Sequence, residues 1–435
     1  MTNMLDEDVP IFNLRAVVRE TGVKPDTLRA WERRYGLPNP KRTDGGHRIY
    51  SRRDIDTVKW LAEKQEAGLG ISKAVELWKQ LDLDGQNGSV AVDRADVLDP
   101  LTSQERDVLS DKREAWIAAC MDFDEQHATR ILSEAFALFS VERVCLDVLM
   151  QGVANIGQRW FEGNTTVQQE HFATSLATRQ LDSLLAAASA PTRHGRILAT
   201  CPPQETHVFS LLLLTVLLRR AGWDVVYLGA NAPIDHISDT IARGHFQLVV
   251  SSAQLLHTAA SLKRLANAIQ PLGIPLVYGG RIFNLLPELR SRIPGTFLGE
   301  TLDGAPKLIE RLMVAQPSTM PMAELPQELS ETLVHYRRQL PAIDAAMEKA
   351  LQGNGITLEQ LSQANRSMGS DISAALSFGN LDYLGEEVAW VEGLLQNQGF
   401  PAELLDRYLI TYHEVLQEHL DERGEPIVDW LSKAL

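Results

Sequence analysis

The chain has 435 residues, of which 44% are hydrophobic and 23% charged, and it carries a formal net charge of −15 at pH 7. This length predicts about three domains, and the composition excludes wholesale disorder and collagen-like or disulfide-scaffold structures. The longest mainly apolar run, Val208 to Leu218, is far shorter than the ~20 residues of a membrane span. The acidic first ten residues lack the apolar core of a secretory signal, so we expect a cytoplasmic protein with no membrane contact.

Charge is distributed unevenly along the chain. Residues 11–60 hold 12 Lys and Arg against 6 Asp and Glu, a local charge of +6, which leaves −21 for the remainder. Residues 321–435 hold 7 Lys and Arg against 19 Asp and Glu, or −12, and would repel a phosphate backbone. Any nucleic acid is therefore expected to meet the N-terminal segment.

The N-terminal segment has the pattern of two short helices followed by a hairpin. Residues 11–22 and 25–36 have helical apolar spacing and end at Gly22 and Gly36, which predicts a helix-turn-helix. Residues 38–50 contain a Gly-Gly turn between flanks that can pair as a small wing, and a further helix is expected to open at residues 51–54. The second helix would enter the major groove of DNA.

Residues 11–78 resemble the MerR-type winged-helix DNA-binding domain, through the string LRAWERRYGLPNPKRTDGGHRIYS at residues 28–51. The alternative is a basic, solvated helix pair with another role. The resemblance implies operator DNA as a partner, and we take 1–78 as this domain. It implies DNA contacts by Arg29, Trp31, Arg33, Arg34, Tyr35, Lys41, Arg42, His47, Arg48 and Tyr50.

Residues 79–109 are rich in Asp, Gly and Ser and predict a flexible linker. Self-association must then arise downstream, and we expect a homo-oligomer, either a dimer or a tetramer. Residues 110–190 have few helix breakers and an apolar repeat of three and four residues, which predicts a four-helix bundle. Within it, nine residues separate Trp160 from the Glu170-His171 pair. Alone, such a histidine is more often a core or surface residue.

Residues 191–315 alternate strands with helices. Strands are expected at 196–201, 224–229, 247–252 and 275–280, with an apolar helix at 208–221 after the first. This alternation predicts a doubly wound, Rossmann-like parallel sheet, whose ligand lies beyond the carboxyl ends of the strands. Those ends carry His207, Ser251-Ser252 and Gly279-Gly280, so one crevice is expected there.

The strand ends resemble those of the cobalamin-binding domain. The matching motifs are Glu205-Thr206-His207, Ser252-Ala253-Gln254 and Tyr278-Gly279-Gly280-Arg281. The resemblance implies that His207 is the lower ligand of cobalt and that Glu205 orients it. Imidazole suits such a metal, and a carboxylate partner fixes the ring tautomer. The glycine pair would let the nucleotide tail of the cofactor pass close to the backbone. A histidine on a Rossmann loop without any cofactor is the alternative.

The order of the three domains resembles that of CarH-type photoreceptor repressors over about residues 11–312. The resemblance implies adenosylcobalamin as the cofactor, with methylcobalamin or another cobalamin as alternatives. It also implies that Trp160 packs on the adenosyl group, that Glu170 bonds to it and that His171 completes the upper pocket. In such proteins dark oligomers bind operator DNA, and light cleaves the cobalt–carbon bond and releases the DNA.

Two positions depart from these families. Ser210 stands where the cobalamin-binding loop has a glycine, and it adds a side chain where backbone and corrin approach closely. Phe161 stands directly after the bundle tryptophan, where light-sensing members have a histidine that captures cobalt after the adenosyl group leaves. Because phenylalanine cannot ligate cobalt, either His171 takes this role or water stays above the metal.

Residues 316–435 lie outside the resemblance and predict an added all-α domain. Helices are expected at 333–351, 358–376, 383–396 and 402–420. Core packing is the first explanation of their apolar stripes. A partner surface is an alternative, as is a second ligand or chromophore pocket. That pocket would be lined by Phe378, Trp390, Tyr412 and Trp430.

Three function classes remain at this point. The first is a cobalamin-dependent, light-responsive regulator, with the direction of regulation resting on the resemblance. The second is a light-independent DNA-binding sensor of cobalamin level or redox state, which Phe161 and Ser210 favour. The third is a corrinoid methyl carrier, which the DNA-binding domain argues against. No catalytic acid-base or nucleophile constellation is present in the sequence, so we expect no enzyme activity.

Overall fold

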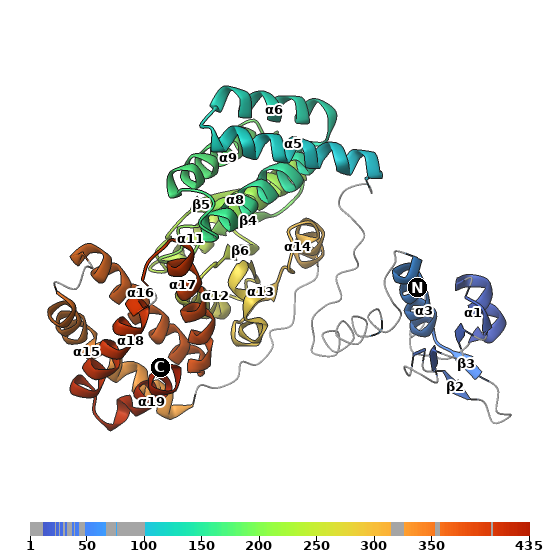
Figure 1. The fold of residues 1–435 in the computed structure, drawn as a ribbon. Helices are drawn as coiled ribbons and strands as arrows, with labels where there is room; N and C mark the ends of the chain where they lie inside the picture. The colour runs from blue at the N-terminus through green and yellow to red at the C-terminus, as the bar shows by residue number, and fades with distance from the viewer. Residues whose placement is uncertain are drawn as a thin grey trace. The chain divides into compact units, whose positions relative to one another are not determined.

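The computed structural model describes most of the chain. The described residues are 12–21, 23–25, 27–28, 31–32, 37–38, 40–42, 48–66, 75, 101–314, 326–352, 357–401 and 403–435. They fall into two compact units, Met1–Asp93 and Arg94–Leu435, which are described separately below. Figure 1 shows their helices and strands. None of the described helices combines the length and apolar character needed to cross a bilayer.

The first unit contains a small antiparallel sheet of order β1-β3-β2. The expected wing is confirmed, because Lys41 pairs with Ile49 and Arg42 with Arg48. The helix expected from residue 11 begins only at residue 14, because Phe12 extends and pairs with Tyr50. The bounds are β1 Phe12–Asn13, α1 Leu14–Thr21, β2 Lys41–Arg42, β3 Arg48–Tyr50 and α3 Arg52–Glu66.

Five α-helices, α5 to α9, and one π-helical stretch of the second unit form a helical bundle, called the bundle below. The flexible linker expected up to residue 109 is too long: a helix already begins at Ser103. Its start is fixed by a capping box, in which Thr102 and Glu105 bond each other's backbone N–H groups. A π-helical stretch is continuous with α8. The bounds are α5 Ser103–Met121, α6 Glu125–Leu138, α7 Val141–Arg143, π-helix Val144–Met150, α8 Gln151–Phe161 and α9 Val167–Ala186.

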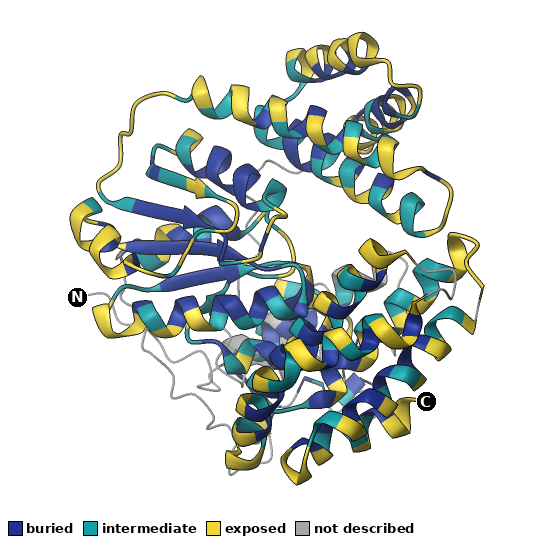
Figure 2. Ribbon diagram, turned by 90° about the vertical axis from the view of Figure 1, so that its left-hand side faces the viewer, coloured by how far each residue is buried: buried dark blue, intermediate teal, exposed yellow. Residues whose placement is uncertain are grey.

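The predicted parallel sheet is confirmed and has five strands in the order β5-β4-β6-β7-β8. The fifth strand and the helices after β7 were not predicted. Figure 2 shows the strands buried between helices whose outer faces are exposed. The strands are β4 Arg196–Thr200, β5 Asp224–Gly229, β6 Leu248–Ser252, β7 Leu276–Gly279 and β8 Thr296–Phe297. The helices are α10 Phe209–Arg220, α11 Ile237–Gly244, α12 Leu256–Ile269, α13 Arg281–Leu285 and α14 Ala305–Val314.

Helices on the two sides of the sheet join it to the other helices of this unit. Leu213 and Val216 of α10 belong to the hydrophobic core of the bundle. On the other side, Leu262 of α12 shares a core with Ile372 of α16. The bundle therefore packs on α10 and the C-terminal helices pack on α12, the helices that flank the sheet.

Helices α15 to α19 form the C-terminal helical domain. Its described residues form helices and no strands, as predicted. Its first helix starts six residues earlier than expected and contains Pro341. The apolar stripe on α18 is core, with Tyr412 and Leu416 fully buried, whereas only Leu384 is buried on α17. A last helix was not predicted. The bounds are α15 Gln327–Leu351, α16 Leu358–Phe378, α17 Leu384–Asn397, α18 Glu403–His419 and α19 Glu425–Ala434.

Alanine substitutions at two glycines of α8 are expected to change the stability of the protein in opposite directions. A Cβ on Gly152 would lie 2.9 Å from two ring carbons of the fully buried Trp116, whereas a Cβ on Gly157 would meet nothing within 4 Å. Overpacking costs about 1–3 kcal/mol, and alanine gains about 0.5–1 kcal/mol over glycine in a helix. Gly152→Ala should therefore lower the thermal unfolding temperature and Gly157→Ala should raise it, as followed by circular dichroism. Shifts of the same sign in both variants would contradict the packing described here.

Candidate functional site

The first unit presents only some of the predicted DNA-binding residues to solvent. Trp31 is 5% exposed and Tyr50 is 1% exposed, and both rings lie in the core of the unit. Trp31 and Tyr50 therefore stabilise the fold of this unit, which in turn positions the basic side chains. Arg48 pairs with Glu32 at 2.7 Å, and Lys41 is exposed on the wing. Arg29, Arg33, Arg34, Tyr35 and His47 lie outside the described residues, as does the side chain of Arg42.

In the second unit, the loop after β4 holds a carboxylate and an imidazole together. The side chain of Glu205 is completely buried, and its Oε1 lies 2.7 Å from Nδ1 of His207. The same oxygen accepts a hydrogen bond from the backbone N–H of His207 at 2.8 Å. The His207 side chain is 58% exposed, so its other ring nitrogen, Nε2, can reach a ligand beyond the end of the strand.

The second oxygen of Glu205 is bonded by residues of another strand end. It accepts hydrogen bonds from the backbone N–H of Gln254 and from the hydroxyl of Thr258, each at 2.7 Å. Burial raises the pKa of Glu205, but the hydrogen bonds from His207, Thr258 and Gln254 outweigh burial and lower the pKa below its usual value. Glu205 is therefore an ionised acceptor, which in the neutral imidazole of His207 keeps the proton on Nδ1 and leaves the lone pair on Nε2.

A charged residue of the bundle also affects the pKa of His207. The hydrogen bond to Glu205 raises the pKa of His207, burial lowers it, and the charges of Glu205 and then Glu170 raise it again. Glu170 lies in the first turn of α9 and accepts a hydrogen bond from Thr174 at 2.8 Å. Its other oxygen is 3.1 Å from His171, whose side chain is 76% exposed. The bundle thus contributes a carboxylate to the field at His207.

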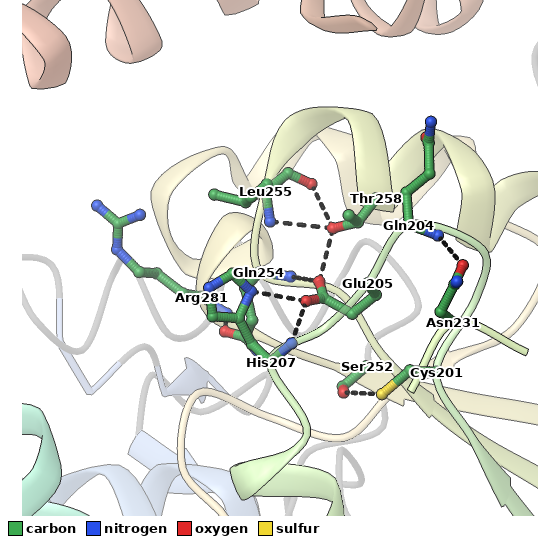
Figure 3. Close-up of polar contacts among 10 residues, drawn as sticks. All are labelled: Cys201, Gln204, Glu205, His207, Asn231, Ser252, Gln254, Leu255, Thr258 and Arg281. Carbon is green, nitrogen blue, oxygen red and sulfur yellow. Dashed lines mark hydrogen bonds and ion pairs between the residues drawn. The ribbon is translucent and has the colours of Figure 1, made fainter. Parts of the chain in front are cut away.

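Further hydrogen bonds connect four strand ends into one site (Figure 3). The side-chain oxygen of Gln254 accepts from the backbone N–H of Arg281, which follows β7, at 2.9 Å. Asn231, which follows β5, accepts from the backbone N–H of Gln204 at 2.8 Å. Ser252, at the end of β6, lies 3.6 Å from the sulfur of Cys201. The predicted crevice residues Glu205, His207, Ser252, Gln254, Gly279 and Gly280 are therefore brought together at one edge of the sheet.

The two glycines after β7 differ in what they permit. Gly280 has φ +127°, and a Cβ there would lie 1.9 Å from the carbonyl oxygen of Ala253, so only glycine fits. A Cβ on Gly279 would meet nothing within 4 Å. Gly280 is thus required by the fold, and open space adjoins Gly279. Ser210 lies at the second position of α10 and is half-buried.

Sequence reasoning missed several residues of this site. Thr258 and Asn231 follow the carboxyl ends of parallel strands, the same signal that identified His207, whereas Arg281 was named in the motif after the last predicted strand but given no role. It also missed the environment of Trp160, which lies at the end of α8 against Trp390 of α17, with ring centroids 6.4 Å apart. The four residues expected to line a second pocket are dispersed, since Phe378 and Tyr412 are buried in the core and Trp390 contacts α8.

The metal-binding groups at the strand ends suit a metal that is already bound within a larger cofactor. Across the described part of the chain, no group of three or more His, Cys, Asp or Glu could hold a bare ion. The crevice instead offers one imidazole, oriented by a buried carboxylate, beside a glycine with open space next to it. Because a corrin would supply most of the ligands of its own metal, one imidazole oriented by a buried carboxylate fits a cobalamin, which His207 would hold.

Comparisons with known families give three matches. The family described as MerR HTH family regulatory protein matches residues 12–81. Two families described as B12 binding domain match residues 113–185 and 195–308, which are parts of the bundle and of the sheet with its helices. The chain therefore has a MerR-type DNA-binding module and B12-binding modules.

Three individual proteins are similar to large parts of the chain. The HTH-type transcriptional repressor CarH of Myxococcus xanthus is 31% identical over 273 residues, which are 62% of this chain and 88% of the relative. The HTH-type transcriptional repressor CarA of the same organism is 32% identical over 224 residues, or 51% and 69% of the two chains. The structure of the Methanosarcina barkeri monomethylamine corrinoid protein is similar over 48% of this chain and 99% of its own, with 15% identity and a TM-score of 0.41.

Thr258 offers a test of the buried carboxylate. Thr258→Val removes the hydroxyl that bonds Glu205 and leaves a buried charge with one donor fewer, which should cost about 1–3 kcal/mol of stability. Thr258→Ser keeps the hydroxyl and is the matched control. Thermal unfolding of the two variants at pH 7 should place the serine variant well above the valine variant. If both lose the same stability, the hydrogen bond to Glu205 is not what matters at this position.

Proposed function

The chain belongs to the family of HTH-type transcriptional repressors that includes CarH and CarA, and we propose that it is a cobalamin-dependent, light-responsive repressor. It binds operator DNA in the dark and releases it in light, with adenosylcobalamin as its cofactor. The observation that carries the proposal is the His207 imidazole, whose Nδ1 is held at 2.7 Å by the completely buried Glu205 while the side chain stays 58% exposed beyond the end of β4. Residues 103–186 are its cap, residues 191–314 its cobalamin-binding domain and residues 326–435 an added helical domain.

The residues at the strand ends have separate roles in this proposal. Nε2 of His207 would bind cobalt from below, and Glu205 would keep the ring in the required tautomer. The open space beside Gly279 would take the nucleotide tail, next to the small side chain of Ser252. Gln254 would hold the loops after β6 and β7 in register through its bond to Arg281. These groups bind and orient the cofactor, and none of them performs turnover.

The bundle residues would cover the upper side. Trp160 would pack on the upper ligand, with Glu170 as a hydrogen-bond acceptor and His171 at the rim. A bound alkylcobalamin supplies a cobalt–carbon bond that visible light can cleave. Loss of the upper ligand would remove the contacts of Trp160 and Glu170, and the bundle would then shift relative to the sheet. In a homo-oligomer, several DNA-binding modules act together through their effective concentration, so separation of the subunits releases the DNA.

A light-independent sensor is the second candidate, and one observation favours it. The ring of Phe161 stacks on Trp390 with centroids 5.8 Å apart and planes at 25°. Position 161 therefore provides neither a cobalt ligand nor an open space for one. A change of cobalamin level or redox state would then move the cap without a photon. The MerR-type module at residues 12–81 argues against a methyl carrier, which gains nothing from operator binding.

The absorbance of the full-length protein loaded with adenosylcobalamin in the dark tests the proposal. Green or blue light should change the spectrum permanently and lower the oligomeric state measured by size-exclusion chromatography. His207→Ala should lose the spectrum of histidine-ligated cobalamin and weaken uptake. Thr206→Ala, beside the proposed ligand, is the control and should keep both.

The outcomes separate the candidates. A histidine-ligated spectrum that light leaves unchanged would retire the photoreceptor and favour the light-independent sensor. A wild-type spectrum in His207→Ala would show that another group holds the metal.

Lys41 tests the DNA-binding role of the wing. Its side chain is exposed on β2, so a contact to a phosphate would make Lys41→Ala weaken operator binding and reduce the slope of log affinity against log salt by about 1. Lys59→Ala is the control within the same unit, because Lys59 pairs with Glu20 at 2.9 Å. Both affinities can be measured by fluorescence anisotropy over a salt series. An equal salt slope in Lys41→Ala and the wild type would remove Lys41 from the interface.

A further inference from the structure

Helix α17 of the C-terminal helical domain lies against the end of bundle helix α8 (Figure 1). The ring of Trp390 stacks on Phe161 and contacts Trp160 in a tilted arrangement at 6.4 Å. The two residues it covers are therefore the proposed upper-pocket tryptophan and the residue after it. No apolar period in the sequence relates these segments, which are more than two hundred residues apart.

Two side-chain amides reinforce this contact. Nδ2 of Asn397 donates to the carbonyl oxygen of Phe161 at 2.9 Å, and Nε2 of Gln398 donates to that of Trp160 at 2.8 Å. The last carbonyl groups of a helix have no partner within the helix. The end of α17 thus gives the carbonyl of Phe161 a partner and adds a second hydrogen bond to the carbonyl of Trp160, which also accepts one from the backbone N–H of Gly163 at 3.0 Å.

Two glycines allow the backbones to approach this closely. Gly163, just after α8, has φ +75°, and a Cβ there would lie 2.4 Å from the carbonyl oxygen of Asn397. A Cβ on Gly393 would lie 3.0 Å from the tip of the Phe161 ring. Larger residues at either position would push α17 away from α8.

The other end of α17 reaches the edge of the crevice. Glu387, one turn before Trp390 on the same face, is half-buried. Burial raises the pKa of Glu387 and the charge of Asp371 raises it further, whereas the charges of Arg281 and His257 and a hydrogen bond from the Leu256 backbone lower it. Leu384 of α17 belongs to the same hydrophobic core as Leu256, the first residue of α12 after β6, and Val388 packs against that core, so α17 extends from the segment after β6 to the bundle.

The rest of the C-terminal helical domain is anchored to the sheet more firmly than α17 is. Nδ1 of His257 lies 2.9 Å from Asp371 of α16, and Lys263 donates to the carbonyl of Ser377 at 2.9 Å. By contrast, Leu384 is the one buried residue among those described on α17. Segments with few buried contacts open at low free-energy cost. Helix α17 can therefore leave α8 while the domain stays folded and attached.

We infer that α17 is an intramolecular clasp, which ties the end of α8 to the crevice edge through Trp390, Asn397 and Gln398. The cap can then leave the crevice only when α17 has released it. This role in cap movement rests on the proposed function, whereas the contact itself does not. The clasp also accounts for Phe161, whose ring serves as the docking surface for Trp390 instead of a cobalt ligand.

Hydrogen exchange of the full-length protein without cofactor, followed by mass spectrometry, tests the contact. Trp390→Ala, which removes the aromatic contacts, should speed exchange of the peptide covering residues 155–166 about tenfold. The double variant Asn397→Ala with Gln398→Ala should speed it to a similar extent, because it loses two ordinary hydrogen bonds. The control is Trp430→Ala on α19, another half-buried tryptophan of the same domain, which should leave this peptide at the wild-type rate. Exchange of that peptide at the wild-type rate in the first two variants would overturn the clasp.

Release of adenosylcobalamin in the dark tests the consequence for the cap. The clasp predicts about tenfold faster dissociation from Trp390→Ala than from the wild type or Trp430→Ala, because the ring contacts of Trp390 with Phe161 and Trp160 are lost. Faster exchange in α8 with unchanged dissociation would show a contact that does not restrain the cap, and would overturn the inference. If the wild type takes up no cobalamin, the proposed function fails, and the exchange comparison alone decides whether α17 holds α8.

Discussion

The completely buried carboxylate of Glu205 is the constraint on which the crevice depends. An ionised group without water is tolerated only when hydrogen bonds replace its hydration. Here the donors come from its own loop, through His207, and from the segment after β6, through Gln254 and Thr258. The strand ends must therefore keep a fixed spacing for the charge to be satisfied. The same spacing fixes the imidazole, so the stability of the loop and the readiness of the site for a ligand have one cause.

Because the strand ends are tied together by hydrogen bonds, the bundle is the part of this unit that would move under the proposed function. The base of the bundle is joined to the sheet through α10, where Leu213 and Val216 are completely buried in the bundle core. The end of α8 is held instead by a stacked ring and two amide hydrogen bonds from α17. A continuous apolar core resists separation far more than a few contacts at a half-exposed surface. Movement is thus expected at the end of α8, with the base as its pivot.

The sequence was sufficient where local pattern determines structure. Alternating strands and helices predicted the parallel sheet, and the position of His207 after a strand predicted its place in the crevice. The helix that starts at Ser103 was not predicted, because the polar composition around it indicated a linker. Thr102 and Glu105 have the sequence pattern of a capping box, which is a signal for this helix start. The two-residue strand at Phe12 is too short to give a period. The contact of Trp390 with α8 depends on tertiary packing alone, which no local pattern contains.

The residue at position 161 shows how an added domain can change the working of a shared site. A side chain that stacks on Trp390 cannot also turn toward a metal, so the end of α8 serves docking and not ligation. A histidine at position 161 that bound cobalt after loss of the upper ligand would hold the shifted cap through the metal. The proposed clasp would hold the resting cap through protein contacts. The difference between its contacts with the closed cap and with the shifted cap would set how far the equilibrium between the two positions can move. Weak contacts suffice for this purpose, because a tightly packed helix would keep the cap closed in every state of the cofactor.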